Sequence, residues 1–190
     1  MIYIKDDFIP EVLFKSLQKY LNNGEFNTVN SGGKDFHIKE SLPHFNEYMI
    51  QTLSNIERKK IRNILSFFRT SNEDLDTTWR IHSDLNINGE KPDRALVLYM
   101  SPRERDDLHG TALWEHDVYG REIPKDITDE DYNSMIDVDA EDTDRWRLST
   151  VVGYEENRLV SYPSSYFHSK YPNVSWKEGR NVFVMFYKYE

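Results

Sequence analysis

The sequence predicts a mainly β protein, a sandwich or barrel, with helices in its N-terminal part. After Asp76 the chain contains several short segments at close spacing that are rich in β-branched and aromatic residues. This pattern of short, closely spaced strand candidates is typical of β-sandwiches and β-barrels rather than of parallel α/β sheets. Before Asp76, apolar residues recur every three or four positions, which is the spacing of a helix face.

Residues 1–76 are therefore expected to form a helical support region. Pro10 suits the first turn of the first helix, because a proline there costs no hydrogen bond. The expected elements are a short strand at 1–5, a helix at 10–21 with Val12, Leu13, Leu17 and Leu21 on one face, a loop at 30–34, and two helices within 42–68.

Residues 77–190 are expected to form the β body, and the 190 residues together fit a single domain. An acidic stretch at 121–144 interrupts this body. Its charges repel one another and it offers few core residues, so we expect a long loop or lid with room for a short helix. The expected strands are 79–87, 95–100, 111–118, 148–153, 158–162 and 181–189.

Composition argues against several classes of function. The formal net charge of −9 repels nucleic-acid backbones, and no Lys/Arg-rich run offsets it. The absence of cysteine excludes disulfides, thiolate metal sites and a cysteine nucleophile. No segment approaches the ~20 apolar residues that cross a bilayer, and the N-terminus lacks a signal peptide pattern. We expect a cytoplasmic protein without a membrane or nucleic-acid partner.

The tripeptide His82-Ser83-Asp84 is the first candidate for chemistry. Side chains alternate along a strand, so His82 and Asp84 should point to the same face, together with Arg80. A third ligand from elsewhere would complete two imidazoles and one carboxylate, the set that leaves iron(II) open to a cofactor and oxygen. By itself the tripeptide is a weak signal, since an ordinary surface strand is the commoner explanation.

Two later residues strengthen the case. His168 follows an apolar and aromatic segment, and Gly179-Arg180 opens the last predicted strand twelve residues further on. A buried arginine needs an anionic partner. A dicarboxylate cofactor would bind the metal at one end and this arginine at the other, by a bidentate salt bridge. Glu178 has the same strand parity as Arg180 and is the competing partner.

In this order and spacing, the chain resembles the 2-oxoglutarate/iron(II) oxygenases, in particular the prolyl 4-hydroxylase-like branch. The resemblance implies a double-stranded β-helix, the jelly roll of two facing antiparallel sheets. It also implies that His82, Asp84 and His168 bind iron and that Arg180 and Tyr99 bind the distal carboxylate of 2-oxoglutarate. Many members of the branch use lysine in place of this arginine. The matching segments are His82-Ser83-Asp84, ALVLYMSP, HGTALWEH, LVSYPSSYFHS and GRNVFVMF.

The implied function is that of a dioxygenase that uses iron(II), 2-oxoglutarate and dioxygen, with ascorbate as an optional reductant. It would hydroxylate a small metabolite or a peptidyl residue and release succinate and carbon dioxide. The alternative from another class is a non-catalytic, cupin-like protein that binds a metal or ligand. Arg180 favours the enzyme, because a simple binder needs no cofactor salt bridge at this distance from the last histidine.

Other polar and aromatic residues near these motifs allow two interpretations each. Arg80 either contacts substrate or cofactor or forms a structural salt bridge, and Tyr99 is otherwise an ordinary core residue. His116 is expected at the surface, at the end of a strand, with a role near the site as the alternative. Trp79 and Trp114 are expected to pack, although one of them can line a substrate cleft. Three histidines show no ligand spacing: His37, His44 and His109.

Overall fold

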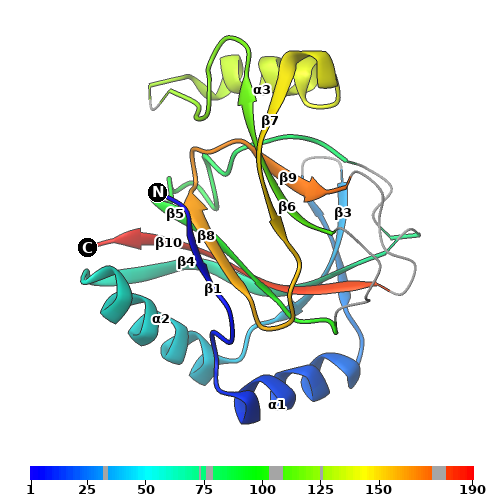
Figure 1. Ribbon diagram of the computed structural model, residues 1–190, viewed down its shortest axis with the longest axis vertical. Helices are drawn as coiled ribbons and strands as arrows, with labels where there is room; N and C mark the ends of the chain where they lie inside the picture. Colours follow the sequence, from blue (N-terminus) through cyan, green and yellow to red (C-terminus); the bar gives the residue numbers. More distant parts are fainter. Residues whose placement is uncertain (32–33, 73, 76–78, 103–108, 125, 173–178) are drawn as a thin grey trace.

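The computed structural model describes residues 1–190 except 32–33, 73, 76–78, 103–108, 125 and 173–178. Its elements form two antiparallel sheets and three α-helices (Figure 1). They are β1 (Tyr3–Lys5), α1 (Glu11–Asn22), β2 (Asn27–Ser31), β3 (Lys34–Glu40), α2 (Pro43–Glu57), β4 (Ile61–Ser71), β5 (Arg94–Tyr99), β6 (Gly110–His116), α3 (Asp129–Asp139), the 3-10 turn η1 (Thr143–Arg145), β7 (Trp146–Gly153), β8 (Leu159–Pro163), β9 (His168–Tyr171) and β10 (Arg180–Tyr189).

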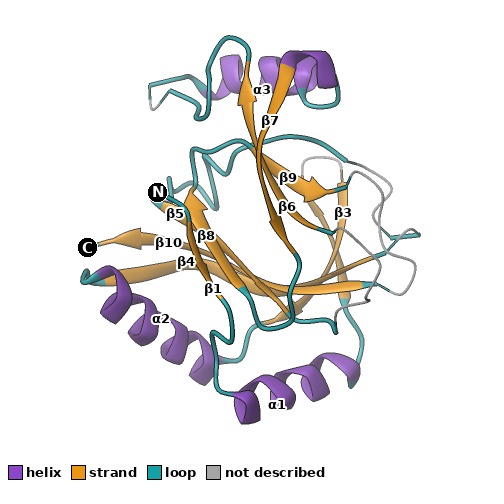
Figure 2. Cartoon of the chain, in the orientation of Figure 1, coloured by secondary structure: helices purple, strands orange, loops and turns teal. Residues whose placement is uncertain are grey.

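The two sheets face each other, which confirms the expected double-stranded β-helix. The larger sheet has the strand order β1-β8-β5-β10-β4-β3-β2, and the smaller sheet has the order β7-β6-β9. Tyr99, Leu113 and Val182 belong to the apolar cluster between them. Helices α1 and α2 cover the outer face of the larger sheet (Figure 2), where Phe45 packs edge-on against Phe183 with ring centroids 4.9 Å apart.

The helices are amphipathic and short. In α1 the buried residues are Phe14, Leu17 and Leu21, whereas Val12 is 82% exposed. The predicted helix is thus confirmed, but its buried face is turned away from Val12. Within the described part of the chain, no helix has both the length and the apolar character needed to span a lipid bilayer.

The second helix predicted within 42–68 is wrong, because residues from Ile61 onward form strand β4. This strand lies between β10 and β3 in the larger sheet. Phe68 faces the cluster under α2, whereas Leu65 and Phe67 pack toward the space between the sheets. A strand that is covered on both faces does not alternate between apolar and polar residues, so its pattern mimics a helix.

The loop predicted at 30–34 belongs to a β-hairpin. Strands β2 and β3 pair in antiparallel register, with Ser31 opposite Lys34, and the glycines 32–33 lie outside the described residues. Strand β2 is exposed along its whole length, so it carries no apolar pattern that would have predicted it. Residues 1–76 therefore supply strands β1 to β4 to the larger sheet, in addition to α1 and α2, which are two of the three expected helices.

The acidic stretch contains the short helix that we allowed for, and this helix packs on the fold. Met135 and Ile136 of α3 are buried with Trp146 and Phe167. The Thr128 hydroxyl caps the helix by accepting a hydrogen bond from the Asp131 amide, at 3.0 Å. The acidic residues of the first turn lie at the positive end of the helix dipole and stabilise it. Residues 129–139 are thus a packed element rather than an open loop.

Candidate metal centre

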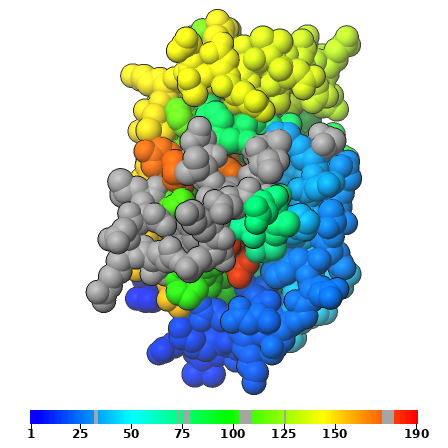
Figure 3. Space-filling model, turned by 90° about the vertical axis from the view of Figure 1, so that its right-hand side faces the viewer, coloured from blue at the N-terminus to red at the C-terminus, as the bar shows by residue number. Residues whose placement is uncertain are grey.

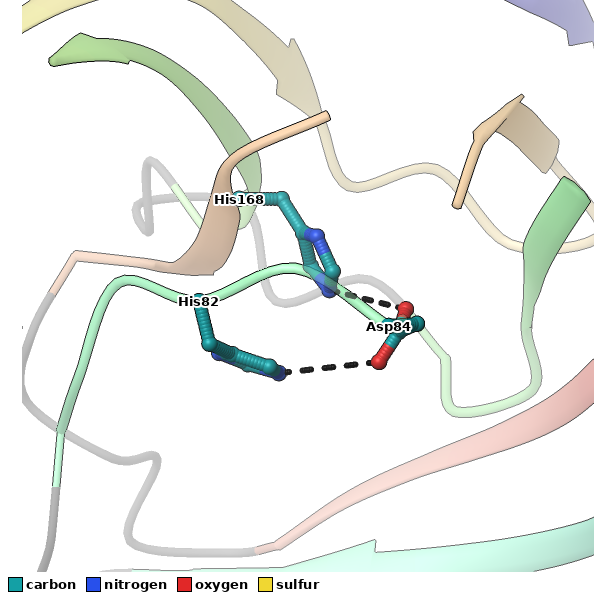
Figure 4. A group of neighbouring side chains, drawn as sticks. All are labelled: His82, Asp84 and His168. Carbon is teal, nitrogen blue, oxygen red and sulfur yellow. Dashed lines mark ion pairs between the residues drawn. The ribbon is translucent and has the colours of Figure 1, made fainter. Parts of the chain in front are cut away.

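His82, Asp84 and His168 come together at one end of the smaller sheet (Figure 4). Their ligand atoms all lie within 4.8 Å of one another. The Nε2 atom of His168 lies 3.3 Å from one Asp84 carboxylate oxygen, and the Nε2 atom of His82 lies 3.9 Å from the other. Among the residues that the structure describes, this is the one group of three His, Cys, Asp or Glu side chains with such spacing.

Main-chain hydrogen bonds fix the two histidines side by side. The His82 amide donates to the His168 carbonyl at 3.0 Å, and the His168 amide donates to the His82 carbonyl at 2.8 Å. The Asp84 amide donates to the carbonyl of Ser164, also at 2.8 Å. Strand β9 in turn pairs with β6, where His168 lies opposite Leu113. The spacing of the three side chains is therefore set by the backbone, independently of any metal.

The strand predicted at 79–87 is only partly formed, with isolated bridges at His82 and Ile87. Between these bridges, the Tyr132 hydroxyl makes the two hydrogen bonds to the Ser83 main chain that a neighbouring strand would otherwise make. It accepts a hydrogen bond from the Ser83 amide at 2.9 Å and donates one to the Ser83 carbonyl at 2.7 Å. His82 and Asp84 nevertheless point to the same side, as alternation predicts (Figure 4).

Both imidazoles present the same nitrogen to the centre of the cluster. The Nδ1 atom of His82 lies 3.3 Å from the Arg80 carbonyl, and that of His168 lies 3.0 Å from the Tyr166 carbonyl. Since a carbonyl only accepts, each Nδ1 carries the proton and each Nε2 keeps its lone pair. Histidines that bind metals commonly donate their second ring N–H in this way.

Electrostatics also favours a cation between these groups. Burial lowers the pKa of His82 well below its ordinary value, and the nearby His168 and Arg80 lower it further. Burial raises the pKa of the Asp84 carboxyl, against the opposing effects of His168 and Arg80. A neutral imidazole and a carboxylate that lacks solvation both gain from a divalent ion. The donor set fits iron(II), which takes two imidazoles and one carboxylate.

A pocket of about 110 Å³ connects His82 with Arg180, the first residue of β10. Figure 3 shows one side of the molecule, on which blue N-terminal residues, orange residues and a small red part of the chain reach the surface. Among the described residues, those that line the pocket are Lys34, Asp35, Phe36, Arg69, Ser71, Trp79, Arg80, His82, Lys170, Arg180 and Val182.

Arg180 has an unsatisfied donor in this pocket. Its Nε atom is buried and makes no hydrogen bond with any residue that the structure describes. Its guanidinium carbon lies 5.3 Å from the ring centre of Tyr99 and 5.9 Å from that of Tyr154. No carboxylate of the described residues lies within 4 Å of it, and the competing partner Glu178 lies outside those residues. A half-buried guanidinium whose Nε has no partner among the described residues fits an incoming carboxylate.

Tyr99 lies beneath Arg180 and is fully buried. Its hydroxyl is 2.8 Å from the Thr111 hydroxyl and 3.4 Å from the Val152 carbonyl. Its ring stacks on Tyr154, at a centroid distance of 4.4 Å. Burial raises the pKa of the Tyr99 hydroxyl, which therefore stays protonated and can donate a hydrogen bond. Tyr99 is not among the described pocket-lining residues, but it directly supports the arginine that is.

His116 is buried, so its predicted position at the surface is wrong. The amides of Val118 and Tyr119 lie 3.3 and 3.4 Å from its Nδ1, so its Nε2 carries the proton and donates to Asp139 at 3.1 Å. This bond ties the end of β6 to α3. The sequence does not reveal it, because α3 was not expected to cover this side of the sheet.

The sequence did not single out two aromatic neighbours of the cluster. Tyr162 lies against His168, with ring centroids 4.7 Å apart, and Tyr132 holds Ser83 from α3. Tyr162 shows a weak signal, because it lies in a predicted strand just upstream of His168. Tyr132 shows none, because its contact joins segments 49 residues apart. Trp79 both lines the pocket and packs edge-on against Trp114, at 6.0 Å.

We predict that Tyr132→Phe weakens iron binding in the folded protein. Without the hydroxyl, the buried amide and carbonyl of Ser83 lose their partner, which costs about 1–3 kcal/mol and loosens the ligand segment. Tyr119→Phe is the matched control, because the structure records no hydrogen bond for its hydroxyl within the described chain. Iron affinity measured by anaerobic calorimetry, well below the unfolding temperature, separates positioning from stability. Equal iron affinity in the two variants would exclude the positioning role.

Neither protein-family models nor curated proteins match the sequence. Solved structures match it well. HygX from Streptomyces hygroscopicus, with nickel, 2-oxoglutarate and hygromycin B bound, aligns with a TM-score of 0.62 at 11% identity over 98% of this chain and 82% of that chain. A Pseudomonas putida prolyl-4-hydroxylase gives 0.58 at 13% identity, over 98% and 92%.

The non-haem α-ketoglutarate-dependent epimerase SnoN from nogalamycin biosynthesis gives a TM-score of 0.65 at 9% identity, over 98% of this chain and 78% of that chain. At such low identity the likeness shows the fold, and the chemistry must be argued from the site itself. The two facing sheets and their strand order agree with the fold of these similar structures. The chain has the double-stranded β-helix fold of the 2-oxoglutarate/iron(II) oxygenases.

Proposed function

We propose that this protein is a 2-oxoglutarate- and iron(II)-dependent dioxygenase that hydroxylates its substrate and releases succinate and carbon dioxide. His82, Asp84 and His168 would hold the metal, and Arg180 would hold the distal carboxylate of the cofactor. The observation that carries the proposal is a pocket lined by both His82 and Arg180, in which the buried Nε of Arg180 has no hydrogen-bond partner among the described residues.

Each residue has a defined task in this proposal. The two imidazoles and the Asp84 carboxylate fix the metal on one side and leave its other side open. Arg180 orients the cofactor by a bidentate contact, and the protonated Tyr99 hydroxyl beneath it supplies a further donor. Tyr162 packs on His168 and keeps water from that side of the cluster. When bound, iron(II) and 2-oxoglutarate would supply, with dioxygen as the oxidant, an oxidative decarboxylation in which one oxygen atom of dioxygen enters succinate and the other is inserted into a C–H bond of the substrate.

The similar solved structures support this assignment, but they carry out different reactions, so they do not identify the reaction on the substrate. HygX is described with 2-oxoglutarate and hygromycin B bound, and others are a prolyl-4-hydroxylase, an epimerase and a carbocyclase. We favour hydroxylation over these other outcomes because the triad and the cofactor arginine alone suffice for it. The rival, a non-catalytic cupin-like binder, gives no reason for a buried arginine donor that faces the pocket.

Anaerobic titration of the iron(II)-loaded protein with 2-oxoglutarate tests the proposal. We expect a metal-to-ligand charge-transfer band, followed by succinate release when oxygen is admitted. Glutarate is the matched control: it has both carboxylates but no keto group, so it should give no such band. Iron binding without a band at saturating 2-oxoglutarate would favour the metal-binding alternative. A screen of small metabolites and peptides for faster succinate release would then identify the substrate.

A further inference from the structure

Tyr162 is a buried tyrosine whose hydroxyl has no hydrogen-bond partner among the residues that the structure describes. It lies in β8, is 2% exposed and belongs to the apolar cluster between the two sheets. The other three buried tyrosines of the described chain all use their hydroxyls: Tyr99, Tyr154 and Tyr187. A buried tyrosine hydroxyl usually finds a partner. The hydroxyl of Tyr162 is therefore free to bond a molecule that enters the site.

The ring of Tyr162 lies against a proposed metal ligand. Its centroid is 4.7 Å from that of the His168 imidazole, and the two rings are tilted by 47°. Backbone pairing holds both residues: β8 pairs with β5, where Tyr162 lies opposite Ala95, and β9 pairs with β6, where His168 lies opposite Leu113. The phenol therefore has a fixed place beside the metal cluster.

Polar groups of both the metal cluster and the cofactor arginine act on the Tyr162 hydroxyl. Burial raises the pKa of Tyr162 well above its ordinary value, the Asp84 carboxylate and Tyr99 raise it further, and the Arg180 guanidinium opposes them. Electrostatic effects of this kind weaken with distance. The hydroxyl therefore lies near a proposed metal ligand and also near the residue proposed to hold the distal carboxylate of the cofactor.

Tyr162 lies behind the described lining of the pocket, as His168 and Tyr99 do. The latter two contact residues that line it: the His168 ring centroid is 4.5 Å from that of His82, and the Tyr99 ring centroid is 5.3 Å from the Arg180 guanidinium carbon. A cofactor that joins the metal to Arg180 would pass this inner group of residues. Of its two tyrosines, Tyr162 is the one whose hydroxyl is not already bonded to the described protein.

We propose that Tyr162 is a further cofactor-binding residue, whose hydroxyl donates a hydrogen bond to the keto-acid end of 2-oxoglutarate, the end that binds the metal. The contact of its ring with His168 carries the choice of this end. The distal end is served by other groups, because the Arg180 guanidinium lies over the rings of Tyr99 and Tyr154. This inference rests on the proposed function. It gives the metal-binding end of the cofactor a protein donor of its own.

Tyr162→Phe tests the inference, because it removes the hydroxyl and leaves the ring on His168. We expect iron(II) affinity to stay as in the parent and 2-oxoglutarate affinity to fall by about 10-fold, as for loss of a hydrogen bond to a charged group. The charge-transfer band should move to shorter wavelength, since a hydrogen bond to the keto acid lowers the energy of the orbital that accepts the electron.

Tyr48→Phe is the matched control. Tyr48 lies on α2, outside the larger sheet, and its ring stacks on Phe45 at a centroid distance of 6.5 Å. Its hydroxyl likewise has no hydrogen-bond partner within the described chain, so the substitution removes the same group far from the metal cluster. Both affinities and the band should remain those of the parent.

Pyruvate separates the two ends of the cofactor, because it has the keto-acid end and no distal carboxylate. In anaerobic titration of the iron(II)-loaded proteins, Tyr162→Phe should weaken pyruvate binding by the same factor as 2-oxoglutarate binding, whereas Arg180→Leu should leave pyruvate binding unchanged. Thermal unfolding of the metal-free protein is a further measurement. Loss of an unbonded hydroxyl in Tyr162→Phe should not lower the unfolding midpoint, whereas Tyr187→Phe, which loses the hydrogen bond to Glu57 at 3.2 Å, should lower it.

The outcomes separate this inference from the proposed function. If the parent gives the band and Tyr162→Phe shows the same band and affinity, the inference is overturned and the dioxygenase assignment stands. Weaker 2-oxoglutarate binding with unchanged pyruvate binding would place the hydroxyl at the distal carboxylate, which also overturns it. So would an unfolding midpoint as low as that of Tyr187→Phe, because the hydroxyl would then be bonded within the protein. A parent without the band removes the assignment and the inference together.

Discussion

Alanine at any one of His82, Asp84 or His168 is expected to abolish stable iron(II) binding and 2-oxoglutarate turnover. Each side chain would supply one of the three protein ligands of the proposed metal centre. Loss of a group that merely orients a ligand costs about 10–100-fold in metal affinity, so loss of a ligand should cost more. Anaerobic calorimetric titration with iron(II) measures the effect directly, and succinate release measures turnover.

The same variants should remain folded, because none of the three residues belongs to the apolar clusters of the core. The hydrogen bonds between His82 and His168 are main-chain bonds and survive truncation of either side chain. His44→Ala is the control, since His44 is exposed near the start of α2. Unchanged iron affinity in any one of the three variants, with a native circular dichroism spectrum, would remove that residue from the ligand set.

Arg180→Leu is expected to weaken 2-oxoglutarate binding strongly and to leave iron affinity nearly unchanged. Loss of one partner from a buried, hydrogen-bonded charge pair typically costs about 2–5 kcal/mol, or roughly 30-fold to several-thousand-fold in affinity. Arg180→Lys should rescue binding only in part, because a point charge cannot reproduce the two parallel hydrogen bonds of a guanidinium. Anaerobic titration of the charge-transfer band gives both affinities.

Arg147→Leu is the control for this series. Arg147 is 79% exposed on β7 and pairs with Glu115 at the surface, so its loss changes net charge without touching the pocket. If Arg180→Leu binds 2-oxoglutarate as well as the parent protein does, Arg180 is paired with a protein group such as Glu178. The dioxygenase assignment would then lose the feature that distinguishes it from a cupin-like binder.

The candidate site could be predicted where its signal lies within short segments. His82 and Asp84 share a face by alternation, and His168 and Arg180 adjoin strands with clear β character. The sequence could not show the pocket, because its lining residues come from positions as distant as Lys34 and Arg180 and meet only after the sheets form.

The fold, like the site, could be predicted where the signal lies within a short segment of the sequence. The strands β5 and β10 were recognised although both of their faces are covered, whereas β4, covered in the same way, was mistaken for a helix because Ile61, Leu65 and Phe68 recur at helical spacing. The acidic residues at the start of α3 were read as mutually repelling charges, whereas Asp129, Glu130 and Asp131 form the first turn of a helix that carries Met135 and Ile136 into an apolar cluster. Composition alone does not distinguish a solvated loop from a helix start.

The connection between β6 and β7 determines which insertions and deletions this protein can tolerate there. These strands are antiparallel neighbours, and the chain between them folds into α3 and η1 before it returns. Closing a loop costs conformational entropy that grows only with the logarithm of its length, so insertions and deletions here are cheap. The contacts of α3 with the fold limit this freedom, among them the hydrogen bonds of the Tyr132 hydroxyl, which hold the ligand segment at Ser83. A different connection between β6 and β7 that lacks a hydroxyl equivalent to that of Tyr132 would preserve the two sheets and impair the metal centre.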